Sequence, residues 1–272
     1  MQQTEPPTAP EFLPKTRGRW RWLIHLALLT AYPVVLGIVG ALHRGDATQP
    51  MLPSNIKTLL QVVAGEAAIF GVVFGIPLLV SRPSREDLFL HWFGGWRPIV
   101  SGLVFSIALR IGLMAVLLGV GVLASLLGTK SQEWVHQLQP DVEQMVSARD
   151  LVENPAYFVL SLTLVSFVLG GLREELWRAG MFAGFRHALP QSLTEPAIRW
   201  TAVTVSALVF GIGHLPQGWG GVLLTGVLGV GLGMILLRKQ SIWPAVFAHG
   251  FFDAATFLFL YAMVKFPALK GI

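Results

Sequence analysis

The chain of 272 residues contains no cysteine and few charged side chains. The absence of cysteine excludes disulfide bonds, thiol catalysis and cysteine-ligated zinc or iron–sulfur sites. Asp, Glu, Lys and Arg make up only 13 % of the residues, against about 25 % in a typical soluble domain. Because 53 % of the residues are hydrophobic, a chain of this size cannot cover its surface with charge. This composition excludes an ordinary cytosolic enzyme and a disordered protein.

The hydrophobic residues are gathered in long apolar runs. A helix needs roughly 20 residues to cross the hydrocarbon core of a bilayer. Seven runs qualify, at about 22–42, 56–80, 99–127, 157–176, 197–212, 222–237 and 242–264. They do not alternate with a period of two, so they predict helices rather than the strands of a membrane barrel. We therefore predict an all-α, polytopic transmembrane helical bundle with about seven spans, eight being the alternative.

The basic residues predict how these spans are oriented. With the N-terminus in the cytoplasm, 11 Lys and Arg residues lie on the cytoplasmic side of the predicted spans and 6 on the other side. Cytoplasmic loops are the ones that carry an excess of Lys and Arg. We expect an integral protein of a bacterial-type plasma membrane with a cytoplasmic N-terminus. These topology signals also account for the net charge of +5, so no nucleic-acid partner is expected.

Polar segments divide the sequence into four parts. Residues 1–19 are polar and rich in proline, which predicts a disordered tail. Residues 20–128 form a three-span membrane region, and residues 129–155 form a polar loop that could hold a short amphipathic helix at the membrane surface. Residues 156–266 form a four-span core. This core contains almost every unusual polar residue of the spans.

Two ionisable residues interrupt the apolar runs of the first half. Glu66 lies in the second predicted span and Arg110 in the third. A charged side chain in mid-bilayer costs roughly 2.5–3.5 kcal/mol on insertion scales, so such residues need partners. We expect Glu66 and Arg110 to form a structural pair that holds the bundle together. The alternative is that each faces a polar cavity.

Polar side chains are denser in three of the last four runs. The set is Glu174, Glu175, Arg178, His214, His249 and Asp253. Each alone has an ordinary structural explanation, as a helix end, a packing histidine or an interhelical clamp. Their combined insertion cost would be on the order of 10 kcal/mol if they were unpaired, so a shared polar cavity is the better explanation.

The spacing of these residues limits how they can face that cavity. Residues four apart share a helix face, so His249 points the same way as Asp253. Glu174 and Glu175 point about 100° apart and cannot both project straight into one cavity. Arg178 can reach either of them. One Glu can therefore be reactive while the other is held in a salt bridge.

A simple seven-span topology places His214 and His249 at different depths. His214 falls at the outer end of the short fifth span and His249 in the inner half of the seventh. They converge only if the short fifth and sixth spans bring His214 inward. Glu174 reaches mid-depth if the fourth helix continues past residue 176, as far as His187.

A carboxylate beside a neutral imidazole can deprotonate a water molecule, which is worth about 10²–10⁴ in rate. A second histidine can donate a hydrogen bond to a developing oxyanion, and one such donor is worth about 10²–10³. The assembled groups therefore favour hydrolysis of an amide bond within the membrane. Water must reach the cavity from one aqueous side.

The order Glu-Glu…Arg, Phe-x-x-x-His and His-x-x-x-Asp on successive apolar helices resembles the CPBP family. This family comprises CAAX proteases, bacteriocin-processing proteins and abortive-infection (Abi) proteins, and it includes type II CAAX prenyl endopeptidases. The resemblance covers residues 160–259, about a third of the chain. It departs from the family pattern in one place. The family motif is Glu-Glu-x-x-x-Arg, whereas Arg178 stands one residue early and Ala179 occupies the expected position.

The resemblance implies a set of catalytic residues, Glu174, Glu175, His214, His249 and Asp253, with Arg178 and Phe210 in support. By position, Glu174 would activate water together with His214, and Glu175 would pair with the arginine of the motif. If the shifted arginine pairs with Glu174 instead, Glu175 becomes the candidate base.

The last motif, carried over by position, would make an oxyanion site from His249 and Asp253. Either Asn or Asp occurs at this last family position. An ionised Asp253 accepts hydrogen bonds and needs a proton to donate one, so His249 is the stronger oxyanion donor.

The implied activity is that of an intramembrane endopeptidase acting on a peptide or membrane-protein substrate, prenylated or not. No cofactor is favoured. Zinc is the alternative, held by Glu174, His214 and His249, because two histidines and a carboxylate can form a catalytic zinc site. The sequence lacks the His-Glu-x-x-His run of helical zinc proteases.

Two other functions stay open. One is a catalytically inactive immunity or scaffold protein of the membrane, which the shifted position of Arg178 favours. The other is a proton-coupled transporter. The absence of inverted repeats argues against transport.

Overall fold

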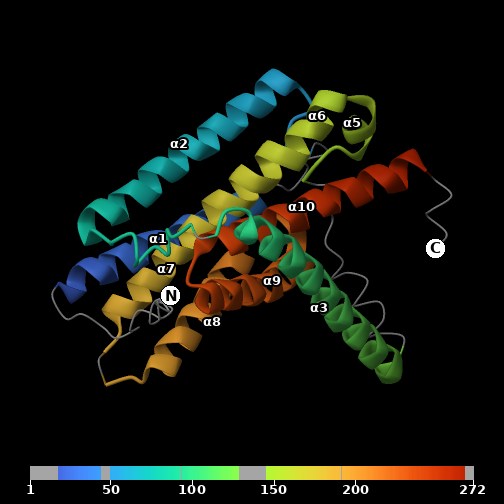
Figure 1. Cartoon of the computed structure of the whole chain (residues 1–272). Helices are drawn as coiled ribbons and strands as arrows, with labels where there is room; N and C mark the ends of the chain where they lie inside the picture. The colour runs from blue at the N-terminus through green and yellow to red at the C-terminus, as the bar shows by residue number, and fades with distance from the viewer. Residues whose placement is uncertain (1–17, 44–49, 93, 129–144, 191, 267–272) are drawn as a thin grey trace, which may run out of the picture.

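The computed structural model describes residues 18–43, 50–92, 94–128, 145–190 and 192–266. Within these ranges the chain is helical and contains no strand. The elements in chain order are α1 (Arg19–Leu42), α2 (Ile56–Ser81), α3 (Arg97–Leu127), α5 (Ala148–Glu153), α6 (Pro155–Leu160), η2 (Ser161–Arg173), α7 (Glu174–Ala188), α8 (Glu195–Gly213), η3 (Leu215–Gln217), α9 (Gly218–Lys239) and α10 (Ile242–Lys265). Figure 1 shows their arrangement.

Among the described residues, seven helical stretches are long and apolar enough to cross a membrane, counting the continuous run Pro155–Ala188 as one. The predicted all-α polytopic bundle is therefore confirmed. The predicted disordered tail lies almost wholly outside the described residues, as does the part of the polar loop before residue 145. The division of the chain into four parts stays a prediction.

Contacts between segments that are distant in the sequence show which helix ends lie together at each end of the bundle. The arrangement is the one expected of helices that cross a membrane in succession. At one end Arg19 Nε donates to the Ala188 carbonyl over 2.8 Å, and the Ile242 amide donates to the Phe89 carbonyl over 3.0 Å. Because α1 begins here, we call this end of the bundle the α1 end. At the opposite end the Tyr157 hydroxyl donates to the Leu52 carbonyl over 3.1 Å. The connection between α2 and α3 therefore lies at the α1 end, beside the last turn of α7 and the first turn of α10.

A half-buried carboxylate, that of Asp87, joins that connection to α7. Asp87 Oδ1 lies 2.8 Å from His187 Nε2 and 3.5 Å from an Arg186 nitrogen. Burial alone would raise the pKa of the Asp87 carboxyl, but hydrogen bonds from His187 and Ser84 outweigh it and hold the pKa well below its usual range. Asp87 is thus an ion-pair partner at neutral pH and ties two parts of the α1 end together.

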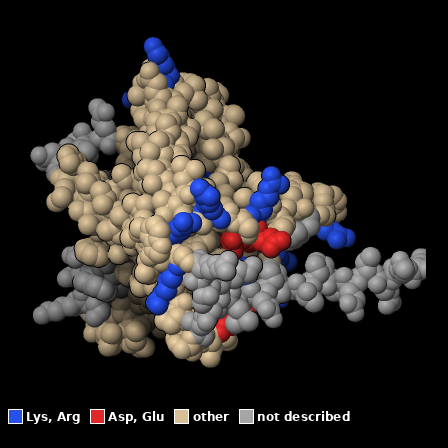
Figure 2. Space-filling view, turned by 90° about the vertical axis from the view of Figure 1, so that its left-hand side faces the viewer, with Lys and Arg blue, Asp and Glu red and all other residues tan. Residues whose placement is uncertain are grey.

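The outer surface is apolar, as a bilayer requires. In α3 only Pro98, Gly102, Ser106 and Ala124 are buried, and Figure 1 shows this helix leaning out from the rest of the bundle. Most of the face seen in Figure 2 is free of acidic and basic side chains. An exposed apolar surface of this extent marks contact with lipid rather than water. The third predicted span is one unbroken helix, α3.

Small residues and one proline set how α1 packs on α7. A Cβ at Gly180 would lie 2.8 Å from Leu29 Cδ1, so the glycine gives the Leu29 side chain room to pack closely on α7. Pro33 interrupts α1 and has no N–H, which leaves the carbonyl of Leu29, four residues earlier, without its helical donor. Trp177 Nε1 donates to that carbonyl over 2.8 Å. The proline therefore creates an acceptor that α7 uses.

The turn after α8 lies beside the middle of α1. A Cβ at Gly213 would lie 3.1 Å from Pro33 Cβ, and a Cβ at Gly37 would lie 3.1 Å from Gly213 Cα. Pro33 is 14 residues into the 24-residue helix α1, so this turn sits inside the bundle. The helical run that contains Glu174 continues to Ala188. Both conditions for convergence of the polar residues are therefore met.

The close approach of α1 to this turn predicts a specific sensitivity. Gly37→Ala should destabilise the protein by about 1–3 kcal/mol, because the new Cβ would meet the rigid backbone of Ile212 and Gly213. Gly71→Ala is the matched control, since a Cβ at Gly71 has nothing within 4 Å. Thermal unfolding in detergent measures both. Equal midpoints for the two variants would contradict the packing described.

Candidate active site

His249 of α10 lies at the centre of three carboxylates. Its Nδ1 is 3.1 Å from Glu175 Oε1, and its Nε2 is 3.6 Å from Glu174 Oε2 and 3.7 Å from Asp253 Oδ2. The imidazole is almost completely buried. The predicted sharing of one helix face by His249 and Asp253 agrees with the last distance. Glu175 lies beside one ring nitrogen and Glu174 beside the other. Both glutamates therefore face His249, although they point in different directions from α7.

Glu175 and Arg178 form an ion pair with no exposure to the surroundings. Glu175 Oε1 accepts hydrogen bonds from Arg178 and from His249 Nδ1. The Arg178 guanidinium also lies over the ring of Phe210, with Cζ 4.7 Å from the ring centroid. The arginine thus pairs with the second glutamate despite its early position in the motif. A spacing of three positions still makes the two partners neighbours on the helix surface.

Glu174 has a different environment. Its side chain is 17 % exposed, whereas that of Glu175 is 0 % exposed, so only Glu174 can meet water. Arg173 donates to Glu174 Oε1 over 2.9 Å and to Glu66 Oε2 of α2 over 2.6 Å. Arg173 therefore links the fourth span to the second. Glu174 Oε2 is left facing His249.

The expected pair between Glu66 and Arg110 is wrong. Glu66 binds Arg173, while Arg110 donates to the Phe252 carbonyl over 2.6 Å and to Thr256 Oγ1 over 3.1 Å. The physical reason is the helix arrangement: α3 packs against α10 and α9, whereas α2 packs against α1 and η2. Two charges in neighbouring spans of the sequence thus find partners in the last four spans.

His214 ends α8 and faces the same cluster. Its Nδ1 lies 2.8 Å from the Phe210 carbonyl oxygen, and its ring is in edge contact with the Phe210 ring, with centroids 4.6 Å apart. A carbonyl only accepts, so Nδ1 carries the hydrogen and Nε2 of the neutral ring is an acceptor. The Phe210 ring also contacts His249 edge-on at 5.9 Å. His214 is close enough to Glu174 for an electrostatic interaction.

Glycines in η2 let α10 come close enough for these contacts. A Cβ at Gly171 would lie 2.7 Å from the Val246 carbonyl oxygen, and a Cβ at Gly170 would collide with the Asp253 carboxylate. η2 is a π-helix, in which the Ser166 hydroxyl donates to the carbonyl of Ser161, five residues earlier. Such widened turns occur frequently at functional sites. Glu174 follows η2 directly.

Two residues at the site, Arg173 and Tyr32, were not among those predicted from the sequence. Arg173 stands immediately before the glutamate pair, and its position inside an apolar run was a usable signal. Tyr32 of α1 lies close enough to Arg173 for an electrostatic interaction, and its buried hydroxyl has no hydrogen-bond partner among the described residues. A lone tyrosine in an apolar span carries little signal in the sequence.

The alternative of a zinc site stays a prediction. Among the described residues, no three His, Cys, Asp or Glu side chains form a group that could hold a metal ion. Glu174, His214 and His249 thus lie near one another without forming a ligand set. We derive no catalytic step through a metal.

The fold and the site together define a class of protein. It is an apolar helical bundle of the membrane-spanning kind with a buried cluster of carboxylates, histidines and arginines at its centre. Residues 155–255 match the family model described as type II CAAX prenyl endopeptidase Rce1-like, and this range includes every residue predicted for the site. The match supports the assignment to the CPBP/CAAX protease family, and at family level an intramembrane CAAX-type protease with a membrane-associated peptide substrate. No curated protein and no solved structure matches the chain.

The buried ion pair predicts a large loss of stability when it is broken. Arg178→Met should cost about 3–5 kcal/mol, because it leaves the charge of Glu175 inside the bundle with only His249 beside it. The double variant Glu175→Gln/Arg178→Met should recover part of the loss, since the uncompensated charge is gone. Denaturant unfolding in detergent measures both.

The control for this experiment is the exposed pair of Arg149 and Glu153, with 81 % and 57 % of the side chains exposed. Arg149→Met should leave stability almost unchanged, as expected of surface pairs. An Arg178→Met protein as stable as the wild type would contradict the role of the buried pair.

Proposed function

We propose that this chain is an intramembrane endopeptidase that hydrolyses a peptide bond of a membrane-associated substrate. The observation that carries the proposal is the convergence of Glu174, Glu175 and Asp253 on His249. His214 is also close enough to Glu174 for an electrostatic interaction. The family match supports the same class of reaction. In this proposal the protein lies in a bacterial-type plasma membrane with its N-terminus in the cytoplasm. The substrate is a peptide or membrane protein, with a prenylated peptide as the first candidate.

Glu174 and His214 activate the water in this proposal. The Phe210 carbonyl holds His214 in the tautomer whose Nε2 is an acceptor, and Arg173 occupies Glu174 Oε1. A water molecule can then donate one hydrogen to Glu174 and one to His214, which leaves an oxygen lone pair for attack. As the water attacks the substrate carbonyl carbon, its proton passes to Glu174. This general base step is worth about 10²–10⁴ in rate.

His249 stabilises the oxyanion. Because Nδ1 donates to Glu175, the ring offers a second donor only as an imidazolium, with Nε2–H facing the space between Glu174 and Asp253. The distances of 3.6 Å and 3.7 Å on that side are longer than hydrogen bonds, so a carbonyl oxygen can take the Nε2 proton as its partner. Asp253 orients the ring. Collapse of the tetrahedral intermediate breaks the C–N bond, and the proton on Glu174 passes to the leaving amine.

The alternative of an inactive immunity or scaffold protein loses its main support. The early position of Arg178 in the motif favoured that alternative. Arg178 nevertheless forms a fully buried ion pair with Glu175. The geometry also favours Glu174 over Glu175 as the base, because Glu175 has no access to water. A transporter stays the weaker alternative.

Substitution of the proposed base and its partner tests the proposal. Glu174→Gln and His214→Ala should each lower kcat by about 10²–10⁴ while the protein folds normally, because each removes an acceptor for the attacking water. Glu153→Gln is the control, since that carboxylate is exposed and distant in sequence. Cleavage is measured on prenylated and unprenylated peptides in detergent or liposomes. Two folded variants that cleave at the wild-type rate would overturn the mechanism.

Metal removal tests the alternative chemistry. Prolonged treatment with a strong chelator should leave cleavage unchanged, because the proposed water is activated by Glu174 and His214 alone. The treated protein is analysed for residual metal by mass spectrometry to ensure that removal is complete. Loss of cleavage that added zinc restores would contradict a metal-free reaction.

A further inference from the structure

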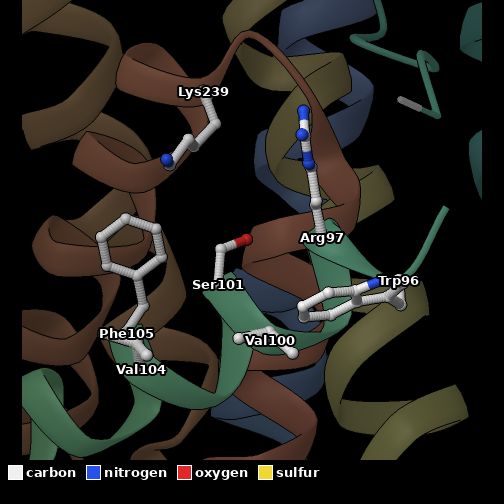
Figure 3. A pocket seen from close by; sticks show the side chains of 7 residues that line it. All are labelled: Trp96, Arg97, Val100, Ser101, Val104, Phe105 and Lys239. Carbon is white, nitrogen blue, oxygen red and sulfur yellow. The ribbon is translucent and has the colours of Figure 1, made fainter. Parts of the chain in front are cut away.

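A second polar feature lies at the α1 end of the bundle, where α3 begins and α9 ends. An open pocket of about 400 Å³ is found there. Figure 3 shows Arg97 and Lys239 on its two sides and Ser101 between them. Apolar side chains of α3, among them Val100, Val104 and Phe105, line the remainder. None of these residues belongs to the candidate active site.

The pocket lies where the membrane surface should be. Arg97 is the first residue of the span formed by α3, and Lys239 is the last residue of α9. Trp96 at the rim is 69 % exposed, and tryptophan concentrates at the interface between hydrocarbon and headgroups. Because α3 rises about 1.5 Å per residue, Val100 and Val104 lie one and two turns deeper than Trp96. The mouth is thus polar and basic, and the floor is apolar.

The two cations at the mouth have no acidic partner in the part of the chain that the structure describes. The lining contains no Asp or Glu, and neither Arg97 nor Lys239 forms an ion pair with a carboxylate of the described residues. Lys239 Nζ instead lies 5.2 Å from the centroid of the Phe105 ring. The arginines of the candidate active site, by contrast, are bound to carboxylates or a carbonyl. The pocket therefore offers two positive charges to an anion from outside the protein.

We propose that this pocket binds an anionic glycerophospholipid of the surrounding bilayer. The phosphate lies between Arg97 and Lys239, and an acyl chain covers Val100 and Val104. The Ser101 hydroxyl donates to the Pro98 carbonyl over 3.1 Å, so its oxygen accepts a hydrogen bond from a hydroxylated headgroup such as glycerol. A free phosphate ion would match only the mouth. A lipid matches both the basic mouth and the apolar floor.

Binding of lipids to the full chain tests this inference. Native mass spectrometry in detergent compares phosphatidylglycerol with phosphatidylcholine, and the wild type should bind the anionic lipid about tenfold more tightly. The variant Arg97→Gln/Lys239→Gln should lose this preference, whereas Arg97→Lys should keep it because the charge remains. Lys57→Gln is the matched control, since Lys57 is an exposed cation near the opposite end of the bundle. Thermal unfolding checks that each variant is folded.

Several results would overturn the inference. One is equal binding of the two lipids to the wild type, and another is a preference that survives in the folded double variant. Displacement of the lipid by inorganic phosphate at the same affinity would identify a site for free anions. A double variant that keeps its lipid preference but has a raised KM for peptide would show that the pocket holds the substrate carboxylate instead. The lipid-binding and displacement readouts do not depend on the proposed catalytic residues.

Discussion

The compensation of one buried charge organises the polar centre of this protein. Glu175 is fully enclosed in an apolar bundle, where an isolated carboxylate is very unfavourable. Arg178 and His249 Nδ1 both donate to its Oε1 atom. This requirement fixes the orientation of the imidazole, and the orientation in turn directs Nε2 towards Glu174 and Asp253. The arrangement that we propose for the reaction thus follows from the need to satisfy a carboxylate that takes no part in it.

The same need for compensation connects the two halves of the chain. Glu174 is bound by Arg173, which also binds Glu66 of α2, and Arg110 of α3 binds backbone and side-chain oxygens of α10 near Asp253. The cluster therefore contains four carboxylates, Glu66, Glu174, Glu175 and Asp253, and three arginines, Arg110, Arg173 and Arg178. In the proposed mechanism an imidazolium at His249 balances the fourth carboxylate. The first three spans, which lie outside the family match, thus supply two of these charges.

Local spacing in the sequence was sufficient for part of this site. The spacing of four positions from His249 to Asp253, and of three from Glu175 to Arg178, places each pair on one helix face. The apolar runs likewise predicted the seven spans. The partner of Glu66 could not be predicted in this way, because the sequence does not state that α2 packs against η2 while α3 packs against α10. The π-helix before Glu174 was equally hidden, since its turns depend on close packing at Gly170 and Gly171.

The depth of His214 shows how the bilayer constrains the reaction site. Between α8 and α9 the backbone leaves regular α-helix beside Pro33, inside the bundle. Non-helical backbone at such a depth is tolerated only where protein buries it or where it faces water. Amides of the turn are satisfied internally, since the Gln217 amide donates to the His214 carbonyl over 2.9 Å. No hydrogen-bond donor to the acceptor nitrogen of His214 is found among the described residues. A water molecule can therefore donate a hydrogen bond to this nitrogen. A turn inside the bundle therefore supplies the histidine that, in the proposed mechanism, accepts a hydrogen bond from the attacking water.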